Sequence, residues 1–223
     1  MNRNRMSSTL RKVSRATVCA LTSAFAASAA FAATTQADLL PQNAPHYRTG
    51  DNWTYQFSDA LSPNTKTVTQ TVTSVRADGS AVLQFGPGGG HAVLTSDANV
   101  VPNASDQHAC GNGLRFPLRT GARYEADCQA HDPGGQLISR RAECEVEGVE
   151  TITTKAGSFA AIKVKMTGTW TPQYGVGGGP MRETLWYAPS AKRIVRGEFQ
   201  GQLAGKGAPA TTEMELVRYA VKP

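Results

Sequence analysis

The side chains best suited to bind a metal ion lie in two short stretches in the middle of the chain. The stretch HAC contains His108 and Cys110, and the stretch CQAH contains Cys128 and His131. Thiolate sulfur and imidazole nitrogen are preferred ligands of Zn²⁺ in proteins. These four residues are therefore a candidate metal clip, although an oxidising compartment would favour disulfides between the same cysteines.

The cysteines also allow a disulfide interpretation. Cys128 and Cys144 both fall on the apolar face of an expected hairpin whose turn contains Asp132-Pro133-Gly134-Gly135. A register with its loop centred near Gln136 would place the two thiols opposite each other, and the disulfide would stabilise the fold by about 3 kcal/mol. Cys110 would then be left over, and the alternative pairs Cys110 with Cys128 or with Cys144.

The N-terminal residues have the composition of an export signal. A basic start is followed by a small-residue apolar run, and Ala30-Phe31-Ala32 fits an A-x-A cleavage site. We therefore expect residues 1–32 to be a signal peptide cleaved after Ala32, and the mature protein to be periplasmic or secreted. A membrane-spanning helix is disfavoured because the run from Ala16 to Ala33 is short and rich in Ala and Ser.

Removal of this segment nearly neutralises the chain. Five of the 23 Lys and Arg residues lie within residues 1–32 and none of the 17 Asp and Glu residues do, so the mature chain has 18 basic and 17 acidic residues. This balance argues against nucleic acid as a partner. We expect no transmembrane segment in the mature chain and no cofactor.

The elements that would position any site are β-strands. In TKAGSFAAIKVKMTGTW (154–170), Ile162, Val164, Met166 and Trp170 share one face, which indicates a strand with one buried side. The same pattern occurs in WTYQF, TVTQTVTSV, AVLQF, ETLWYA, RIVRGEFQGQL and TTEMELVRYAV. The expected fold is all-β, an antiparallel, hairpin-connected curved sheet that forms an open barrel or a sandwich.

The expected domain organisation is a flexible mature N-terminus over residues 33–45 and a single β domain over residues 46–223. YRTGDNWTY (47–55) recurs in outline as LRTGARYEA (118–126), and each half also contains a glycine run, at 86–90 and at 175–180. Two degenerate β-meanders, 46–105 and 106–223, would explain this recurrence. The glycine runs are expected to be hairpin loops, because no helix pattern follows them to complete a phosphate site.

No residue is assigned a catalytic role. The chain has no Gly-x-Ser-x-Gly elbow, and Glu143, Glu145 and Glu147 alternate onto what should be a solvated strand face. The candidates for a ligand surface are aromatic: Trp53, Trp170, Trp186 and Tyr187 would line a cavity if the sheet encloses one, and would otherwise fill the core.

Four segments in order resemble the TapB-like exported bacterial proteins, which are related to a family of β-rich domains of unknown function. They are GDNWTY, FPLRTGARY (116–124), VEGVETITTKAGSFAAIKVK (146–165) and ETLWYAPSAKRIVR (183–196). The chain departs from the family pattern at Lys155, where Pro is common, and at Tyr124, where Trp is common. The resemblance implies a curved antiparallel sheet or open barrel in the cell envelope, and it implies no activity.

Three functional classes fit these observations. The first is an exported, non-enzymatic, envelope-associated binding module for an apolar or lipid-like ligand. The second is an extracytoplasmic enzyme or metal-binding protein that uses the Cys/His cluster, and the third is an assembly or adhesion partner that offers a strand edge. A ligand-binding interior favours the first, converging Cys and His side chains favour the second, and a free flat edge favours the third.

Overall fold

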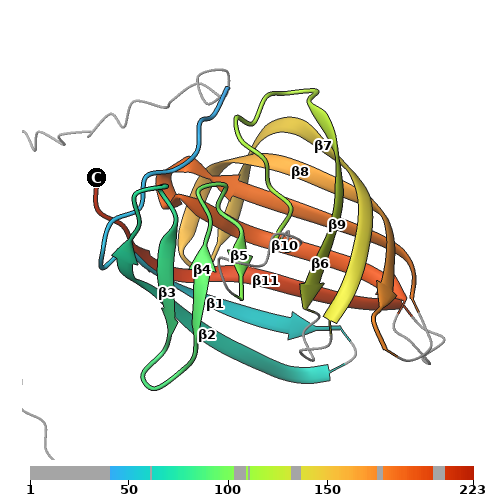
Figure 1. Cartoon of the computed structure of the whole chain (residues 1–223), viewed down its shortest axis with the longest axis horizontal. Coiled ribbons are helices and arrows are strands. Elements are labelled where there is room, and N and C mark those ends of the chain that lie inside the picture. The colour runs from blue at the N-terminus through green and yellow to red at the C-terminus, as the bar shows by residue number, and fades with distance from the viewer. Residues whose placement is uncertain are drawn as a thin grey trace, which may run out of the picture. The chain divides into compact units, whose positions relative to one another are not determined.

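The computed structural model describes residues 41–60, 62–102, 109, 111–131, 137–174, 178–202 and 209–223, with the side chains of residues 62, 63, 130, 131, 202, 209 and 210 left out. The described residues form antiparallel strands and one short 3-10 helix (Figure 1). The elements are β1 (Asn52–Asp59), β2 (Ser62–Val75), β3 (Ala81–Phe85), β4 (His91–Leu94), β5 (Val100–Val101), β6 (Arg123–His131), β7 (Leu137–Thr154), β8 (Gly157–Pro172), β9 (Gly179–Ala188), η2 (Pro189–Ala191), β10 (Arg193–Gln202) and β11 (Pro209–Ala220). Within this part of the chain, no helix has the length and apolar character needed to cross a membrane.

All eleven strands belong to one sheet, in the order β5-β4-β3-β2-β1-β11-β10-β9-β8-β7-β6. The strands β1 to β5 form one meander and β6 to β11 form a second, and the two join where β1 pairs with β11. As far as the described residues go, the sheet stays open, because its terminal strands β5 and β6 do not pair with each other. The expectation of an antiparallel, hairpin-connected curved sheet is confirmed. Whether the two meanders arose by duplication stays a prediction.

One face of this sheet, which we call the interior face, carries most of the core. Paired residues of antiparallel strands place their side chains on the same side, so the register links Phe57 to Met214, Met214 to Gly197, and Gly197 to Leu185. The alternation predicted for 154–170 is confirmed, since its four apolar residues Ile162, Val164, Met166 and Trp170 are all buried. The period-two pattern of the sequence therefore translates directly into one apolar face.

The long β7–β8 hairpin bends over the end of the sheet. It continues past the last residue of β9, and its tip reaches β11: Ala156 donates its backbone N–H to the carbonyl of Leu216 at 3.2 Å. Phe159 packs against Tyr219, with ring centroids 5.6 Å apart. Gly168 permits β7 and β8 to approach closely along this curve, because a Cβ there would lie 2.0 Å from the carbonyl oxygen of Arg141.

The segment between β5 and β6 covers another part of the interior face. Asn99 holds it in place, since its side-chain amide donates to the carbonyl of Leu114 at 2.8 Å and accepts the N–H of Leu114 at 2.9 Å. Leu114 and Leu118 are buried against Ile162 and Tyr187 in the same apolar cluster. The core over the second meander is thus a sheet covered by its own connecting segment.

The register of the β6–β7 hairpin corrects one prediction. Cys144 lies opposite Tyr124, and Cys128 lies opposite Arg140. These pairs are symmetric about position 134, whereas a Cys128–Cys144 disulfide needs a loop centred near 136. Cys144 is a free, buried thiol, so the Cys128–Cys144 pairing is wrong, although both residues do lie on the interior face.

The short strands β4 and β5 were not predicted. The first glycine run forms the loop between β3 and β4, as expected, and His91 begins β4. In the second glycine run, residues 175–177 lie outside the described residues, and Gly179 and Pro180 begin β9. The turn at 132–135 and the cleavage site at Ala32 also lie outside the described residues.

Candidate functional site

Arg193, the first residue of β10, is buried in the core and has no acidic partner in the described part of the chain. Its side chain is only 4% exposed, and one guanidinium nitrogen, Nη2, donates to Oε1 of Gln70 at 2.9 Å. The guanidinium carbon lies 5.0 Å from the centre of the Trp53 ring and 5.8 Å from that of Tyr55. These two cation–π contacts and the hydrogen bond to Gln70 hold the charge in place. Arg193 also lies close enough to the Tyr55 hydroxyl to counteract part of the rise that burial causes in the pKa of Tyr55.

Local structure explains why Arg193 points inward. The chain leaves β9 through η2, and Lys192 then adopts a left-handed conformation with φ of 58°. The pairing of β10 with β9 shifts between Ile194 and Arg196, so strict alternation breaks there. As a result Arg193, Ile194 and Val195 are all buried, which a regular strand with one buried face would not allow.

Several polar atoms around Arg193 have no hydrogen-bond partner among the described residues. These are Nε and Nη1 of Arg193 itself and the hydroxyl groups of Tyr47 and Tyr187. Buried polar groups are normally hydrogen-bonded, and an unpaired buried charge costs several kcal/mol. Tyr55 differs, because its hydroxyl donates to the carbonyl of Ile194 at 2.9 Å.

Electrostatics connect these groups. Burial raises the pKa of Tyr47 well above its usual value, and the positive charge of Arg193 opposes that rise. The pKa of Tyr187 is also raised by burial and lowered in part by Arg193. Both phenols therefore stay protonated at neutral pH and serve as hydrogen-bond donors, next to a positive charge. We call Gln70, Tyr47, Tyr55, Tyr187 and Arg193 the Arg193 cluster.

A second polar group on the interior face is a closed ion pair. Arg140 of β7 and Glu183 of β9 bond to each other across β8, and their side chains are 11% and 13% exposed. They lie near Trp170, whose indole Nε1 is buried without a partner among the described residues and which packs with Ile138 and Met181. Since each charge of the pair neutralises the other, a ligand would compensate less unpaired charge here than at Arg193.

The buried thiol of Cys144 is a poor nucleophile. Burial raises its pKa from the usual 9.0 to about 11, and the side chain has no measurable exposure. Reactive cysteines are exposed and have a lowered pKa. The geometry therefore gives Cys144 a packing role against Tyr124 and Met166, its neighbours on β6 and β8.

The four predicted ligand-surface aromatics occupy different surroundings. Trp53 is fully buried and its indole donates to the carbonyl of Ala191 at 2.7 Å, while Tyr187 packs edge-on against Phe116 at 5.1 Å. Trp170 lies on the interior face. Trp186 pairs with Lys163 and Arg196, its indole bonds to Glu150, and its ring is buried in the same apolar cluster as Trp53. The cavity-lining role of these residues stays a prediction.

The predicted metal ligands cannot be assembled from the described residues. His108 and Cys110 lie outside them, and the side chain of His131 is not described. Cys128 is not a free thiol, and no group of three or more potential ligands occurs among the described side chains. The metal interpretation therefore stays an untested prediction.

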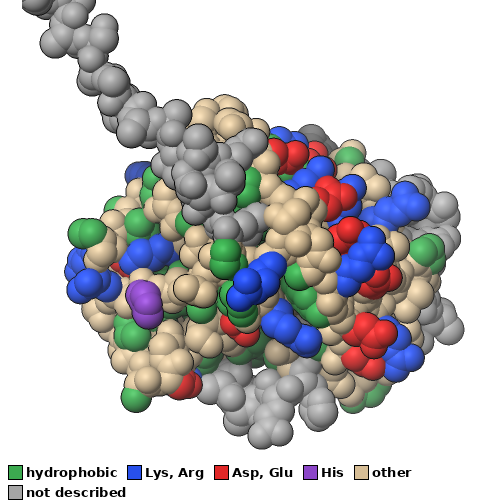
Figure 2. Space-filling model, turned by 90° about the horizontal axis from the view of Figure 1, so that it is seen from above, with side chains coloured by type: hydrophobic (Ala, Val, Ile, Leu, Met, Phe, Trp, Pro, Cys, Tyr) green, Lys and Arg blue, Asp and Glu red, His purple; other side chains and the backbone are tan. Residues whose placement is uncertain are grey.

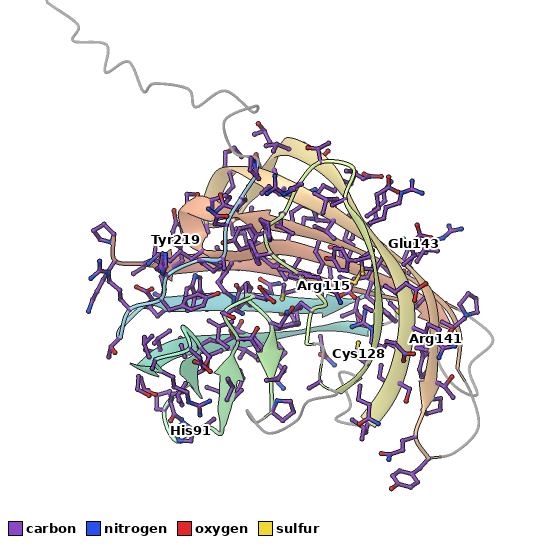
Figure 3. The ribbon with its side chains drawn as sticks, turned by 45° about the horizontal axis from the view of Figure 1, so that its top comes forward. His91, Arg115, Cys128, Arg141, Glu143 and Tyr219 are labelled. Atoms are coloured by element: carbon purple, nitrogen blue, oxygen red, sulfur yellow. The ribbon has the colours of Figure 1, made fainter. Side chains whose placement is uncertain are left out.

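The outer face of β6 and β7 carries ion pairs. Arg123 lies near Glu143 and Glu145, and Asp127 near Arg141; all are strongly exposed except Glu145, which is half-buried. Figure 2 shows basic and acidic side chains interspersed on this side of the molecule. In Figure 3, Arg141 and Glu143 point away from the curve of β7, whereas Arg115 and Cys128 lie inside it. This is the solvated carboxylate face expected from the sequence.

Sequence reasoning missed the Arg193 cluster. An arginine next to the apolar pair Ile194-Val195 was the available signal, but alternation from Ile194 places Arg193 on the outer face. The irregular pairing that turns it inward depends on contacts between strands. Tyr47 and Gln70 come from parts of the chain 146 and 123 residues before Arg193 in sequence, so no local pattern joins them.

Comparisons with known proteins add only distant structural likenesses. No protein-family model and no curated protein matches the chain, so the TapB-like resemblance stays a prediction. A proposed lipoprotein from Parabacteroides distasonis aligns with a TM-score of 0.46 and 16% identity, over 80% of this chain and 99% of that one. A proposed exported protein with a YmcC-like fold from Bacteroides fragilis gives 0.44 and 19%, over 80% and 99%.

The hypothetical lipoprotein YmcC from Escherichia coli gives a TM-score of 0.43 and 10% identity, over 76% of this chain and 85% of that one. The three neighbours are thus described as exported proteins or lipoproteins, with no activity stated. Since all the TM-scores are below 0.5, we draw no conclusion about this chain from them.

Proposed function

We propose that the protein is an exported, non-enzymatic binding module that holds an apolar or lipid-like ligand against the interior face of its curved sheet. The observation that carries this proposal is the set of buried polar groups without partners within an aromatic interior. Ligand sites in proteins are mostly apolar, with a few polar groups that fix the orientation of the ligand. Trp170, Tyr47, Tyr187 and Arg193 supply such groups among buried rings and aliphatic side chains.

The sheet edges support binding over strand-edge assembly. Edge strands that pair with partners are usually long and flat, and charged or short edges discourage pairing. Here β5 has two residues, and β6 carries the charged ladder described above. Ala109 also forms a bridge to Gln129, which occupies part of the outer edge of β6.

Export supplies the setting for the proposal. The basic, apolar and A-x-A pattern of residues 1–32 predicts removal of a signal peptide and release of a nearly neutral mature chain. A carrier or receptor for an apolar ligand in the cell envelope would fit such a chain. The N-terminal sequence of the protein recovered from the extracytoplasmic fraction tests this part, with Ala33 expected as the first residue.

Native mass spectrometry of the mature protein purified from its own compartment tests the binding function. We expect a non-covalent adduct that disappears under denaturing conditions and reappears in an organic extract as an amphiphilic molecule. A mature protein that carries no adduct, and that also fails to take up neutral or acidic alkyl probes, would contradict the proposal. A variant in exposed Arg218 serves as a control for unspecific surface binding, because this residue lies outside the interior face.

The export proposal also bears on the cysteines. In an oxidising compartment a pair of nearby cysteines forms a disulfide. Cys144 is free and Cys128 is not, and Ala109, the residue before Cys110, lies beside Gln129, the residue after Cys128. We propose that Cys128 pairs with Cys110, which was one of the alternatives open from the sequence.

A further inference from the structure

The charge of Arg193 determines which apolar ligands suit the interior. Its guanidinium group carries five N–H donors on three nitrogen atoms. Among these nitrogens, Nη2 donates to the side chain of Gln70. Nε and Nη1 have no acceptor among the described residues, although the side chain is 96% removed from solvent. The ten ion pairs of the described residues include Arg140, Arg141 and Arg196 but not Arg193. A positive charge with free donors is therefore present in the core.

Within the described part of the chain, the neighbours of Arg193 add donors and no acidic group. Tyr47 packs edge-on against Trp53, with centroids 6.2 Å apart, and Arg193 lies over the same Trp53 ring. Tyr187 lies opposite Ile194, the residue after Arg193. Asp97 is close enough to raise the pKa of Tyr47. Its carboxylate accepts the backbone N–H of Phe116 at 3.4 Å.

The number and type of free donors match one anionic group. A carboxylate has two oxygens with about four acceptor positions, and an arginine fork is well suited to it. Two guanidinium nitrogens and two phenol hydroxyls in this cluster lack acceptors. Water could accept some of these hydrogen bonds, but water leaves the charge uncompensated.

We propose that the Arg193 cluster binds the carboxylate of an amphiphilic ligand, with the apolar part of that ligand against the interior aromatic and aliphatic side chains. This inference rests on the proposed binding function and specifies its ligand as an acidic amphiphile. Arg193 supplies charge and hydrogen bonds, and Tyr47 and Tyr187 donate their hydroxyls. Trp53 and Tyr55 keep the guanidinium in place through their ring faces.

A comparison of dodecanoate with dodecanol tests the inference. Both probes have the same alkyl chain, and only dodecanoate carries a negative charge. Delipidated wild-type protein is titrated with each probe by calorimetry and by fluorescence of its tryptophans. We expect dodecanoate to bind about 10- to 100-fold more tightly than dodecanol, which corresponds to the loss of one charge-assisted interaction.

Variants assign this preference to the cluster. Arg193→Gln should abolish the preference for dodecanoate, while Arg196→Gln should retain it, because Arg196 is on the same strand but pairs with Glu198 outside the cluster. Tyr187→Phe keeps the ring and removes only the hydroxyl, and should weaken dodecanoate binding about threefold to tenfold with little change in dodecanol binding. If Arg193→Gln does not fold by circular dichroism, Tyr187→Phe and Tyr47→Phe decide.

The outcomes separate this inference from the proposed function. Equal binding of the two probes to wild-type protein, a preference that survives in Arg193→Gln, or a preference that is undiminished in both tyrosine variants overturns the carboxylate site and leaves the binding function standing. Binding of neither probe overturns both. A shared preference in wild type and Arg196→Gln that is lost in Arg193→Gln supports both.

Discussion

At the scale of single residues, charged and thiol groups in the core differ in how completely the fold satisfies them. Asp51 is fully buried, and both of its carboxylate oxygens are hydrogen-bonded. The carboxylate accepts hydrogen bonds from the backbone N–H of Arg48 at 3.0 Å, from the backbone N–H of Lys222 at 2.8 Å and from Nζ of Lys192 at 3.2 Å. It thereby ties the start of β1 to the turn after β9 and to the C-terminal segment. Arg193 is also buried, but Nη2 alone of its three guanidinium nitrogens has a hydrogen-bond partner among the described residues. This contrast distinguishes a structural charge from a candidate ligand contact.

The role of Asp51 can be tested by Asp51→Asn. The amide keeps the shape but loses the charge for Lys192 and cannot accept at both former oxygen positions, so we expect a loss of about 1–3 kcal/mol in the free energy of unfolding. Urea denaturation followed by tryptophan fluorescence measures this loss. Glu213→Gln, at an exposed position of β11, serves as the comparison. An Asp51→Asn protein as stable as wild type would contradict the assigned role.

The cysteines give a second prediction at this scale. In the native mature protein, iodoacetamide at pH 8 should label no cysteine quickly, because the Cys144 thiol is buried and its pKa is raised to about 11. After denaturation without reductant, one thiol per mature chain should react, and peptide mapping should place it at Cys144. Labelling of Cys110 or Cys128 under those conditions would rule out the proposed disulfide.

The same thiol predicts a pH dependence of stability. Since the folded pKa is higher than the usual 9.0, the unfolded state loses the proton first as pH rises. The contribution of Cys144 to stability is therefore complete below about pH 9 and decreases between pH 9 and 11. Cys144→Ala should remove this decrease in melting temperature relative to wild type, and an unchanged pH profile in the variant would contradict the assignment.

At the scale of elements, the interior face combines strict alternation with one buried ion pair across β8. Arg140 and Glu183 project from β7 and β9 on either side of β8 and are almost fully removed from solvent. Neither strand would tolerate its charge alone at this depth. The basic residue on β7 and the acidic residue on β9 therefore depend on each other, although these two strands are separated by β8.

A double-mutant cycle measures this coupling. Arg140→Met alone should destabilise the protein by about 3–5 kcal/mol, because Glu183 would remain buried and unpaired. The double variant Arg140→Met with Glu183→Leu should be clearly more stable than the sum of the two single effects predicts. Additive effects in chemical denaturation would show that the two groups do not depend on each other.

At the scale of the whole molecule, the tip of the β7–β8 hairpin closes one end of the interior. Lys155 donates its backbone N–H to Glu215 at 2.9 Å and its ammonium group to Gln56 at 2.7 Å. With the Ala156–Leu216 hydrogen bond, these contacts attach the hairpin to β1 and β11. The buried aromatic cluster that contains Trp53 and Phe159 lies at this end.

Packing of Phe159 should therefore stabilise the whole fold. Phe159 is 4% exposed, and its loss in Phe159→Ala should reduce the free energy of unfolding by about 3–5 kcal/mol. Hydrogen exchange should show faster exchange in both β8 and β11. Val75→Ala, which truncates a side chain that is 41% exposed, is the comparison and should change stability little. An effect limited to β8 would show that the hairpin tip is not coupled to β11.

The amino-acid sequence by itself determined the all-β class, most strands and the apolar face of each, because alternation and turn residues act within a few residues of one another. Ile162, Val164, Met166 and Trp170 were assigned to a buried face from spacing alone, and all four are buried. The tertiary structure decided the register of β6 with β7, and hence that Cys144 meets Tyr124 rather than Cys128. It also decided that Arg193 turns inward to Gln70, Trp53 and Tyr55. The contacts of Arg193 join residues more than 100 positions apart. They depend on strand order and on a local shift in pairing, which no repeat of side-chain types along the chain can encode.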